Sequence, residues 1–276
     1  MKVTVIIFLW FTGALFMSQC KKINYYTDDP VLFEGSKILA HRGGGNAIYR
    51  ENTFESCINA LPGNDGIEVD VQISKNHTIW LSHSSDVLFC GGEVKCFVAV
   101  TDAEIESITT CDTADISYTK LEDVMKYMKE NNIYKYISID MKGWVPCNAG
   151  TLDIEGLMRL ETEQVIALGE KYGLTSYLLF ENQLASVLNW AKSKNSNVQT
   201  FIYSFGNFEK QMLVALDNDL DGISYKSNFG DLLDNDKMYL LHKKGLKVMA
   251  WNIPDSVSQA YLVSIQVDLL QLDLKP

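Results

Sequence analysis

Short apolar segments alternate with helix-like segments along most of this chain. Eight of the apolar segments have the length and composition of buried strands, and most are separated by stretches with a helical spacing of apolar residues. Strands joined by helical crossovers are typical of an α/β fold with a parallel sheet. Strands are expected at 38–41, 66–71, 136–141, 176–180, 198–203, 222–225, 246–251 and 267–272, and helices at 53–60, 120–131, 154–172, 183–194, 208–216, 232–244 and 255–263.

Eight strands that alternate with helices predict a (β/α)8 TIM barrel, a fold that typically takes about 250 residues. The alternative is a doubly wound open sheet, although no GxGxxG follows the first strand to favour nucleotide binding there. One irregular zone, residues 84–118, interrupts the alternation after the second strand. We expect it to form a small inserted lobe, entered through a short extra strand at 78–82.

Residues 1–19 have the composition of a secretory signal peptide, because a single Lys2 precedes a mostly apolar run that is too short for a membrane span. The sequence MSQC that ends at Cys20 resembles a loose bacterial lipobox, so lipidation of Cys20 and simple cleavage are the two alternatives. The protein is therefore expected to be exported, and either secreted or lipid-anchored at the cell envelope. In the second case Cys20 would associate it with a membrane. Residues 20–35 would form a tether and residues 36–276 the barrel domain.

The net charge and the cysteine content of the chain bear on its binding partners and its disulfides. The formal net charge is -11, which makes nucleic acid an improbable partner because its binding needs a basic face. Five cysteines remain after Cys20, so at least one thiol has no partner within the chain. Cys90 and Cys96 flank the short segment GGEVK and are the pair favoured for a disulfide; the alternative is that all five are free.

The strand GIEVDV carries two carboxylates on one face. Side chains alternate along a strand, so Glu68 and Asp70 point one way and the intervening apolar residues the other. In a barrel the two acids would point inward near the end where barrel enzymes keep their active sites. A divalent cation would offset their repulsion, and hard oxygen ligands favour Mg²⁺ or Ca²⁺. The alternative is a half-exposed strand with solvated acids.

The strand YISIDMK repeats this pattern with Asp140 and Lys142 on the inward face. A lysine beside a metal-bound carboxylate suits an anionic substrate such as a phosphate, whereas the simpler interpretation is an ion pair at the rim. His41 and His83 each end a strand-like segment and would lie at the same rim. A pair of histidines there could serve as general base and general acid, although a single histidine is more often structural.

Together, the segments HRGGGNAIYRENTFES, GIEVDVQISKNHTIWLSH and ISIDMKG resemble the glycerophosphodiester phosphodiesterase family, within the phospholipase C-like phosphodiesterase barrels. The Ser-Phe pair at 204–205, HKKGLKVMAWNI and VDLLQLDLKP resemble later motifs of the same family. The resemblance covers roughly residues 36 to 276. It implies a TIM barrel and the metal-dependent hydrolysis of a glycerophosphodiester to glycerol 3-phosphate and an alcohol.

The resemblance also implies roles for individual residues. His41 and His83 would be the acid–base pair, and one divalent cation, Mg²⁺ or Ca²⁺, would be held by three carboxylates. Arg42 and Lys142 would bind phosphate oxygens. Glu51 would support the site, and Trp251 would form an apolar wall beside the substrate. The implied metal ligands are Glu68, Asp70 and Asp140.

Departures from the family pattern leave other readings open. Asp140 stands where the family usually has glutamate, Ser84 replaces the aspartate of a common His-Asp pair, and Asn252 and Leu272 replace threonines. An aspartate at the third ligand position also resembles the phospholipase D/sphingomyelinase D barrels, which favours a lipid phosphodiesterase as the alternative. A non-catalytic surface protein that binds a phosphorylated glycan or lipid is a third hypothesis. The nucleophile, water or a substrate hydroxyl, is open.

Overall fold

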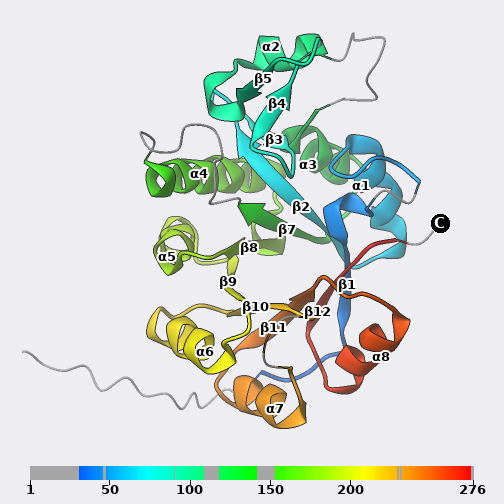
Figure 1. The fold of residues 1–276 in the computed structure, drawn as a ribbon, viewed down its shortest axis with the longest axis vertical. Coiled ribbons are helices and arrows are strands. Elements are labelled where there is room, and N and C mark those ends of the chain that lie inside the picture. Colours follow the sequence, from blue (N-terminus) through cyan, green and yellow to red (C-terminus); the bar gives the residue numbers. More distant parts are fainter. Residues whose placement is uncertain are drawn as a thin grey trace, which may run out of the picture.

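Residues 31–45, 48–89, 91–108, 118–141, 153–228, 230 and 232–274 are described by a computed structural model. Within them, eight parallel strands follow one another around a ring that closes where the first strand pairs with both the second and the last (Figure 1). The expected TIM barrel is therefore confirmed. The strands are β1 (Lys37–Ala40), β2 (Gly66–Ile73), β7 (Tyr136–Met141), β8 (Leu178–Asn182), β9 (Gln199–Ser204), β10 (Gly222–Lys226), β11 (Lys247–Trp251) and β12 (Leu269–Leu272).

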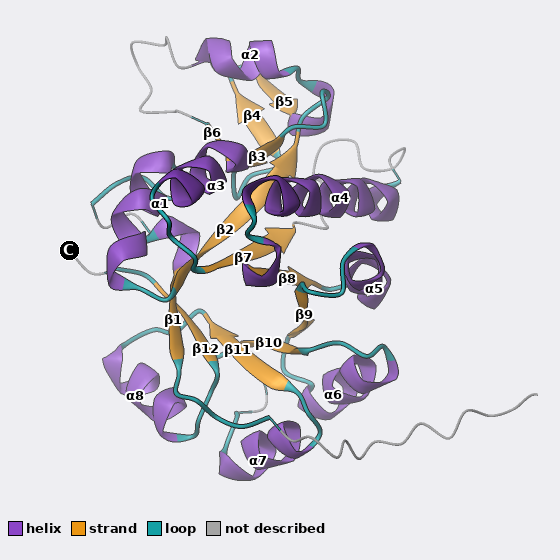
Figure 2. Ribbon diagram, turned by 180° about the vertical axis from the view of Figure 1, so that it is seen from behind, coloured by secondary structure: helices purple, strands orange, loops and turns teal. Residues whose placement is uncertain are grey.

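Helices surround the ring of strands, as the view from behind also shows (Figure 2). Each expected helix is present, with ends that shift by at most a few residues. The first of them begins at Thr53, whose hydroxyl accepts from the Ser56 backbone in a capping box. The helices around the barrel are α1 (Phe54–Ala60), α3 (Leu121–Glu130), α4 (Ile154–Tyr172), α5 (Ala185–Lys194), α6 (Phe208–Asp217), α7 (Asn235–Lys243) and α8 (Ser256–Ser264).

The barrel separates two apolar regions. Outward-facing side chains such as Ile67, Val69 and Ile139 belong to the large core between strands and helices. A smaller cluster inside the barrel includes Leu179 and Phe201, both fully buried. This inner cluster fills the interior, so the barrel is packed rather than a pore, and polar side chains collect toward the carboxyl ends of the strands.

The inserted lobe is built on an extension of the barrel sheet. Antiparallel β3 (Ile79–Leu81) pairs with β2, and β6 (Thr119–Lys120) pairs with β3. Beyond them lie a hairpin, β4 (Asp86–Leu88) with β5 (Val94–Cys96), and the short α2 (Asp102–Ser107). The lobe has a core of its own, formed by Trp80, Val87, Phe97, Val100, Ile105 and Ile108.

The two described cysteines differ in state. Cys96 is disulfide-bonded, whereas Cys57 is a free and fully buried thiol. Cys90, the expected partner of Cys96, lies outside the described residues, as does the whole of the expected signal and lipobox segment. The described part of the expected tether packs against α7, where the Val31 backbone donates to the carbonyl of His242. None of the described helices has the length and apolar character needed to cross a membrane.

Candidate active site at the carboxyl end of the barrel

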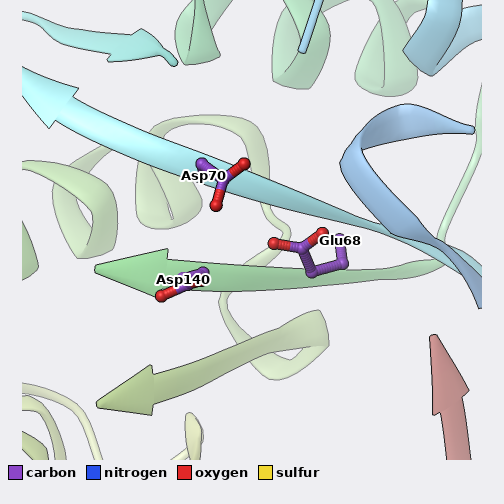
Figure 3. Close-up of side chains that lie close together, drawn as sticks. All are labelled: Glu68, Asp70 and Asp140. Carbon is purple, nitrogen blue, oxygen red and sulfur yellow. The ribbon is translucent and has the colours of Figure 1, made fainter. Parts of the chain in front are cut away.

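Three carboxylates meet inside the barrel mouth. Glu68 and Asp70 project inward from β2, and Asp140 projects from the adjacent β7 in register with Asp70 (Figure 3). One ligand oxygen from each residue lies within 4.8 Å of the other two. All three side chains are almost completely buried. Burial, and next the charge of Asp70, raise the pKa of Glu68 to about 8, so the cluster is electrostatically strained as it stands.

The chemistry of this donor set fits a divalent cation. Carboxylate oxygens at this spacing are the ligands that Mg²⁺ and Ca²⁺ prefer, and a bound cation would offset the repulsion between them. The described residues contain no thiolate or imidazole within the cluster that would instead favour zinc. The inward orientation expected from strand alternation is therefore observed, and the third acid lies where the pairing of β2 with β7 brings it.

His41 sits directly beside this cluster. It begins the single helical turn His41–Gly43 that follows β1, because β1 ends at Ala40, one residue earlier than expected. Its Nδ1 lies 2.8 Å from Oδ1 of Asp273, and its Nε2 lies 3.8 Å from Oε2 of Glu68. Burial lowers the pKa of His41, but the hydrogen bond to Asp273 and the charge of Glu68 outweigh it and raise the pKa to about 9. The ring therefore has one nitrogen anchored and the other directed at the acids.

Arg42 ties the first turn to the acidic strand. Its backbone N–H donates to Glu68 at 2.8 Å, and its guanidinium contacts Glu51 at 3.0 Å and Asp70 at 3.3 Å. Asn52 completes the link, because its amide donates to Asp70 and its carbonyl oxygen accepts from the Asp70 backbone. Arg42 and the turn that contains Glu51 and Asn52 thus hold the carboxylates of β2 in place. The Arg42 side chain is only partly exposed.

His83 follows β3 and lines a cavity of about 240 Å³ that Glu68 and Asp140, but not Asp70, also line. Five of the expected site residues line it besides His83. Lys142, the other expected phosphate ligand, lies outside the described residues. Glu51 lines an adjoining cavity rather than this one. The lining comprises His41, Arg42, Glu68, His83, Asp140, Met141, Gln183, Tyr203, Phe205, Trp251 and Gln271.

Three aromatic rings form the opposite wall. The ring centroid of Trp251, at the end of β11, lies 5.9 Å from that of Tyr203 on β9 and 6.1 Å from that of Phe205, which follows β9. The Tyr203 and Phe205 centroids are 5.7 Å apart. The Tyr203 hydroxyl is also hydrogen-bonded to Asp140, and burial raises its pKa well above the usual range. The wall therefore combines an apolar surface with the Tyr203 hydroxyl, which holds Asp140 in place.

A fourth carboxylate lies deeper in the barrel. Glu181 on β8 is fully buried and accepts hydrogen bonds from Ser138, Ser224 and Gln271. Burial, followed by the charge of Asp140, raises its pKa to about 7. With three donors around it, this side chain is a fixed anchor below the cavity.

The three glycines after Arg42 are explained by close packing. All three have positive φ angles of 65 to 122°, a region that disfavours other residues. A side chain on Gly43 would meet Cys57, one on Gly44 would meet Leu274, and one on Gly45 would meet Asp273. The glycines therefore let the His41 turn lie against α1 and against the segment after β12, where Asp273 reaches the histidine.

Sequence reasoning did not identify Asp273 or Tyr203 as site residues. Asp273 follows the last strand in the closing segment LQLDLKP, and an acid at a strand's carboxyl end was the available signal. Tyr203 lies on the inward face of an expected strand, but nothing in its own segment indicates that it faces Asp140. Such contacts depend on which strands face one another across the barrel interior.

Comparison with known proteins agrees with this geometry. The model of the glycerophosphoryl diester phosphodiesterase family matches residues 41–273. No curated protein sequence matches the chain. Similar solved structures include a glycerophosphodiester phosphodiesterase from Parabacteroides distasonis, with 15% identity, a TM-score of 0.68, and coverage of 87% of this chain and 93% of that one.

Two further structures show the same fold. One is a phosphodiesterase from Oleispira antarctica in complex with the product sn-glycerol-3-phosphate, with 18% identity and a TM-score of 0.68. The match covers 87% of this chain and 93% of the Oleispira antarctica chain. A glycerophosphodiester phosphodiesterase from Thermotoga maritima has 20% identity and a TM-score of 0.64, with 86% and 94% covered.

Proposed function

Because the chain belongs to the glycerophosphoryl diester phosphodiesterase family, a family of phosphoric diester hydrolases, we propose that its barrel mouth releases glycerol 3-phosphate and an alcohol from a glycerophosphodiester. The observation that carries the proposal is one cavity lined by two histidines beside three buried carboxylates. The product complex of the Oleispira antarctica phosphodiesterase supports the same reaction.

The acidic cluster would hold one divalent cation, Mg²⁺ or Ca²⁺, through Glu68, Asp70 and Asp140. When bound, the cation would draw charge from the phosphate and lower the pKa of His41 by offsetting the neighbouring carboxylates. Arg42 would bind a phosphate oxygen, since its guanidinium already lies against the cluster. Lys142 is proposed for the same task from its position two residues beyond Asp140.

The two histidines divide the proton transfers. His41 accepts a proton from the attacking oxygen, whether of water or of a substrate hydroxyl, through Nε2, the nitrogen that faces Glu68. Asp273 holds Nδ1 and stabilises the imidazolium that forms. His83, which lines the same cavity, donates a proton to the leaving alcohol. Trp251 and its aromatic neighbours offer the glycerol backbone an apolar wall.

An assay of glycerol 3-phosphate release from glycerophosphocholine tests the proposal. We expect activity with Mg²⁺ or Ca²⁺, loss of activity in EDTA, and recovery when the metal is returned. Substitution His41→Ala should reduce kcat by about 10²- to 10⁴-fold, the usual contribution of a general base. Full activity in EDTA would remove the cation from the mechanism, and a wild-type rate in His41→Ala would remove the histidine.

A lipid substrate is the second candidate, and one observation favours it. Leu88 and Val94 on the β4–β5 hairpin are 40% and 54% exposed beside the barrel mouth. Exposed apolar residues at a mouth suit an interface with lipid. Activity on choline-lipid vesicles that exceeds activity on soluble glycerophosphocholine would support this candidate, and the reverse order would reject it.

We also propose that the chain is exported. The support is the signal-like composition of residues 1–19, followed by Cys20. Sequencing the amino terminus of the mature protein should show cleavage near this point, and the full-length amino terminus would contradict it. Metabolic labelling with a fatty acid separates the two forms: label lost in Cys20→Ala indicates a lipid anchor, and label retained in that variant excludes it.

A further inference from the structure

A buried group of polar side chains adjoins the catalytic cavity. Its centre is Glu181 on β8, whose two carboxylate oxygens accept hydrogen bonds from side chains of three other strands. All four side chains are at most 5% exposed. The three donors are Ser138 on β7, Ser224 on β10 and Gln271 on β12. Of the four residues, Gln271 alone also lines the cavity, so it connects the buried group to the site where substrate would bind.

The orientation of the Gln271 side-chain amide is fixed by its neighbours. Its Nε2 lies 2.5 Å from Oε1 of Glu181 and 2.9 Å from Sδ of Met249. A carboxylate oxygen and a thioether sulfur are both hydrogen-bond acceptors. The NH2 group of the amide must therefore face these two atoms, and the carbonyl oxygen Oε1 of Gln271 must face away from them.

The Oε1 atom of Gln271 is a hydrogen-bond acceptor that faces the cavity. Within the part of the chain that the structure describes, no group donates to this oxygen. It is also not one of the buried side-chain atoms without a partner, so it reaches the cavity that Gln271 lines. An acceptor with a fixed direction in a nearly buried position favours a ligand that donates a hydrogen bond to it.

Gln271 lies between the two sides of the cavity. In the strand order, β12 stands between β1, which leads to His41, and β11, which ends at Trp251. The register pairs Ala250 with Leu270, so Trp251 and Gln271 are each the next residue on neighbouring strands. A substrate with its phosphate at the acids beside His41 and its glycerol against Trp251 therefore passes Gln271.

We infer that Oε1 of Gln271 accepts a hydrogen bond from the terminal hydroxyl of the glycerol, and that Glu181 is the positioning residue that holds Gln271 for this contact. The inference rests on the proposed function, because it names a contact to the substrate of that reaction. The 2-hydroxyl lies next to the carbon that carries the phosphate, whereas the terminal hydroxyl extends toward the aromatic wall. A substrate without the terminal hydroxyl would leave Oε1 unpaired, so Gln271 selects for glycerol.

The test compares two substrates that differ in this hydroxyl alone: glycerophosphocholine, and the phosphocholine ester of propane-1,2-diol at its primary oxygen. The wild-type protein should favour glycerophosphocholine by about tenfold or more in kcat/KM, as expected when a nearly buried acceptor is left unpaired. Gln271→Met, of similar length but without the oxygen, should lower kcat/KM for glycerophosphocholine and leave that for the analogue almost unchanged, which brings the ratio close to one. Gln271→Asn withdraws the oxygen by one methylene and should shift the ratio in the same direction.

Two variants of Glu181 separate positioning from packing. Glu181→Gln keeps one acceptor oxygen for Gln271, because the serine hydroxyls around it can turn and accept from the new NH2 group. This variant should retain the wild-type ratio. Glu181→Met removes both acceptors and should bring the ratio toward one.

The matched control is Gln199→Met, the same exchange at a position away from the cavity. Gln199 begins β9 and accepts from Lys247, and it does not line the catalytic cavity. This control should keep the wild-type kinetics on both substrates.

Several outcomes would overturn the inference while the proposed function stands. They are equal rates of the wild-type protein on both substrates, an unchanged ratio in Gln271→Met and Gln271→Asn, or equal losses on both substrates in these variants. An unchanged ratio in Glu181→Met would reject the positioning role of Glu181. If the wild-type protein hydrolyses neither substrate with Mg²⁺ or Ca²⁺ present, the proposed function fails and the inference fails with it.

Discussion

Nδ1 of His41 lies 2.8 Å from the carboxylate of Asp273, a contact that joins the turn after the first strand to the end of the last strand. It fixes the orientation of the imidazole and directs Nε2 toward Glu68. The same contact accounts for the third glycine of the turn, because the space beside Gly45 is occupied by Asp273.

Asp273→Asn should reduce kcat by about 10- to 100-fold, a fraction of what a positioned general base supplies. The amide keeps an oxygen for Nδ1 but no longer stabilises the imidazolium. Because Asp273 lies away from the substrate cavity, KM should change little. Steady-state kinetics beside a thermal melt checks this. A drop in Tm with kcat intact would show that Asp273 has a structural role only.

Gly45→Ala should reduce kcat by displacing Asp273 from His41, since the new methyl group would lie 3.0 Å from the carboxylate. Gly92→Ala is the matched control. Gly92 also has a positive φ, of 89°, but open space surrounds it. Both variants should lose about 1 kcal/mol of stability from backbone strain, measured by urea unfolding. Only Gly45→Ala should lose activity, and equal kinetics in the two variants would contradict the packing account.

Glu68→Gln should stabilise the metal-free protein at pH 8 while abolishing activity. The pKa of Glu68 is raised to about 8 by burial and by Asp70, so its contribution to stability is fully present below its unfolded pKa and is lost as pH rises toward 8. The uncharged amide avoids that loss, which we expect to be about 2 kcal/mol. Thermal melts in EDTA measure it. Added Mg²⁺ or Ca²⁺ should raise the Tm of the wild-type protein much more than that of the variant, and equal shifts would argue against a cation at this cluster.

The free energy of unfolding should fall as the pH rises from 5.5 to 8, because Glu161 loses its proton in this range. This carboxyl on α4 is fully buried, one of its oxygens has no hydrogen-bond partner, and burial raises its pKa to about 8. A raised pKa means that the folded state holds the proton more tightly, so stability declines between the unfolded and folded pKa values. Glu161→Gln should flatten the decline by about 2 kcal/mol, as measured by urea unfolding at both pH values. An unchanged pH profile would show that Glu161 does not titrate in this range.

The barrel could be predicted because its signals are local. Strand alternation placed Glu68 and Asp70 on one face, and each strand segment carried its own apolar pattern. The pairing of β2 with β7 then brought Asp140 into register with Asp70. The acidic cluster therefore followed from three residues whose positions depend on adjacent strands alone.

Contacts across the barrel mouth could not be predicted in the same way. The Tyr203 bond to Asp140 joins strands that are not neighbours, because β8 lies between β7 and β9. The β4–β5 hairpin was expected only as part of an irregular lobe, since its two strands are three residues each and carry little periodic signal. The identity of Lys142 as a phosphate ligand stays a prediction.

The two members of the His41–Asp273 contact stand 232 residues apart in the sequence. Glu68, Asp70 and Asp140 are all synthesised before Asp273, the residue that anchors His41. A fragment that ends before β12 would contain the three carboxylates but would lack Asp273, which orients His41. The alignment of His41 is thus a property that the barrel acquires only when β12 is in place beside β1.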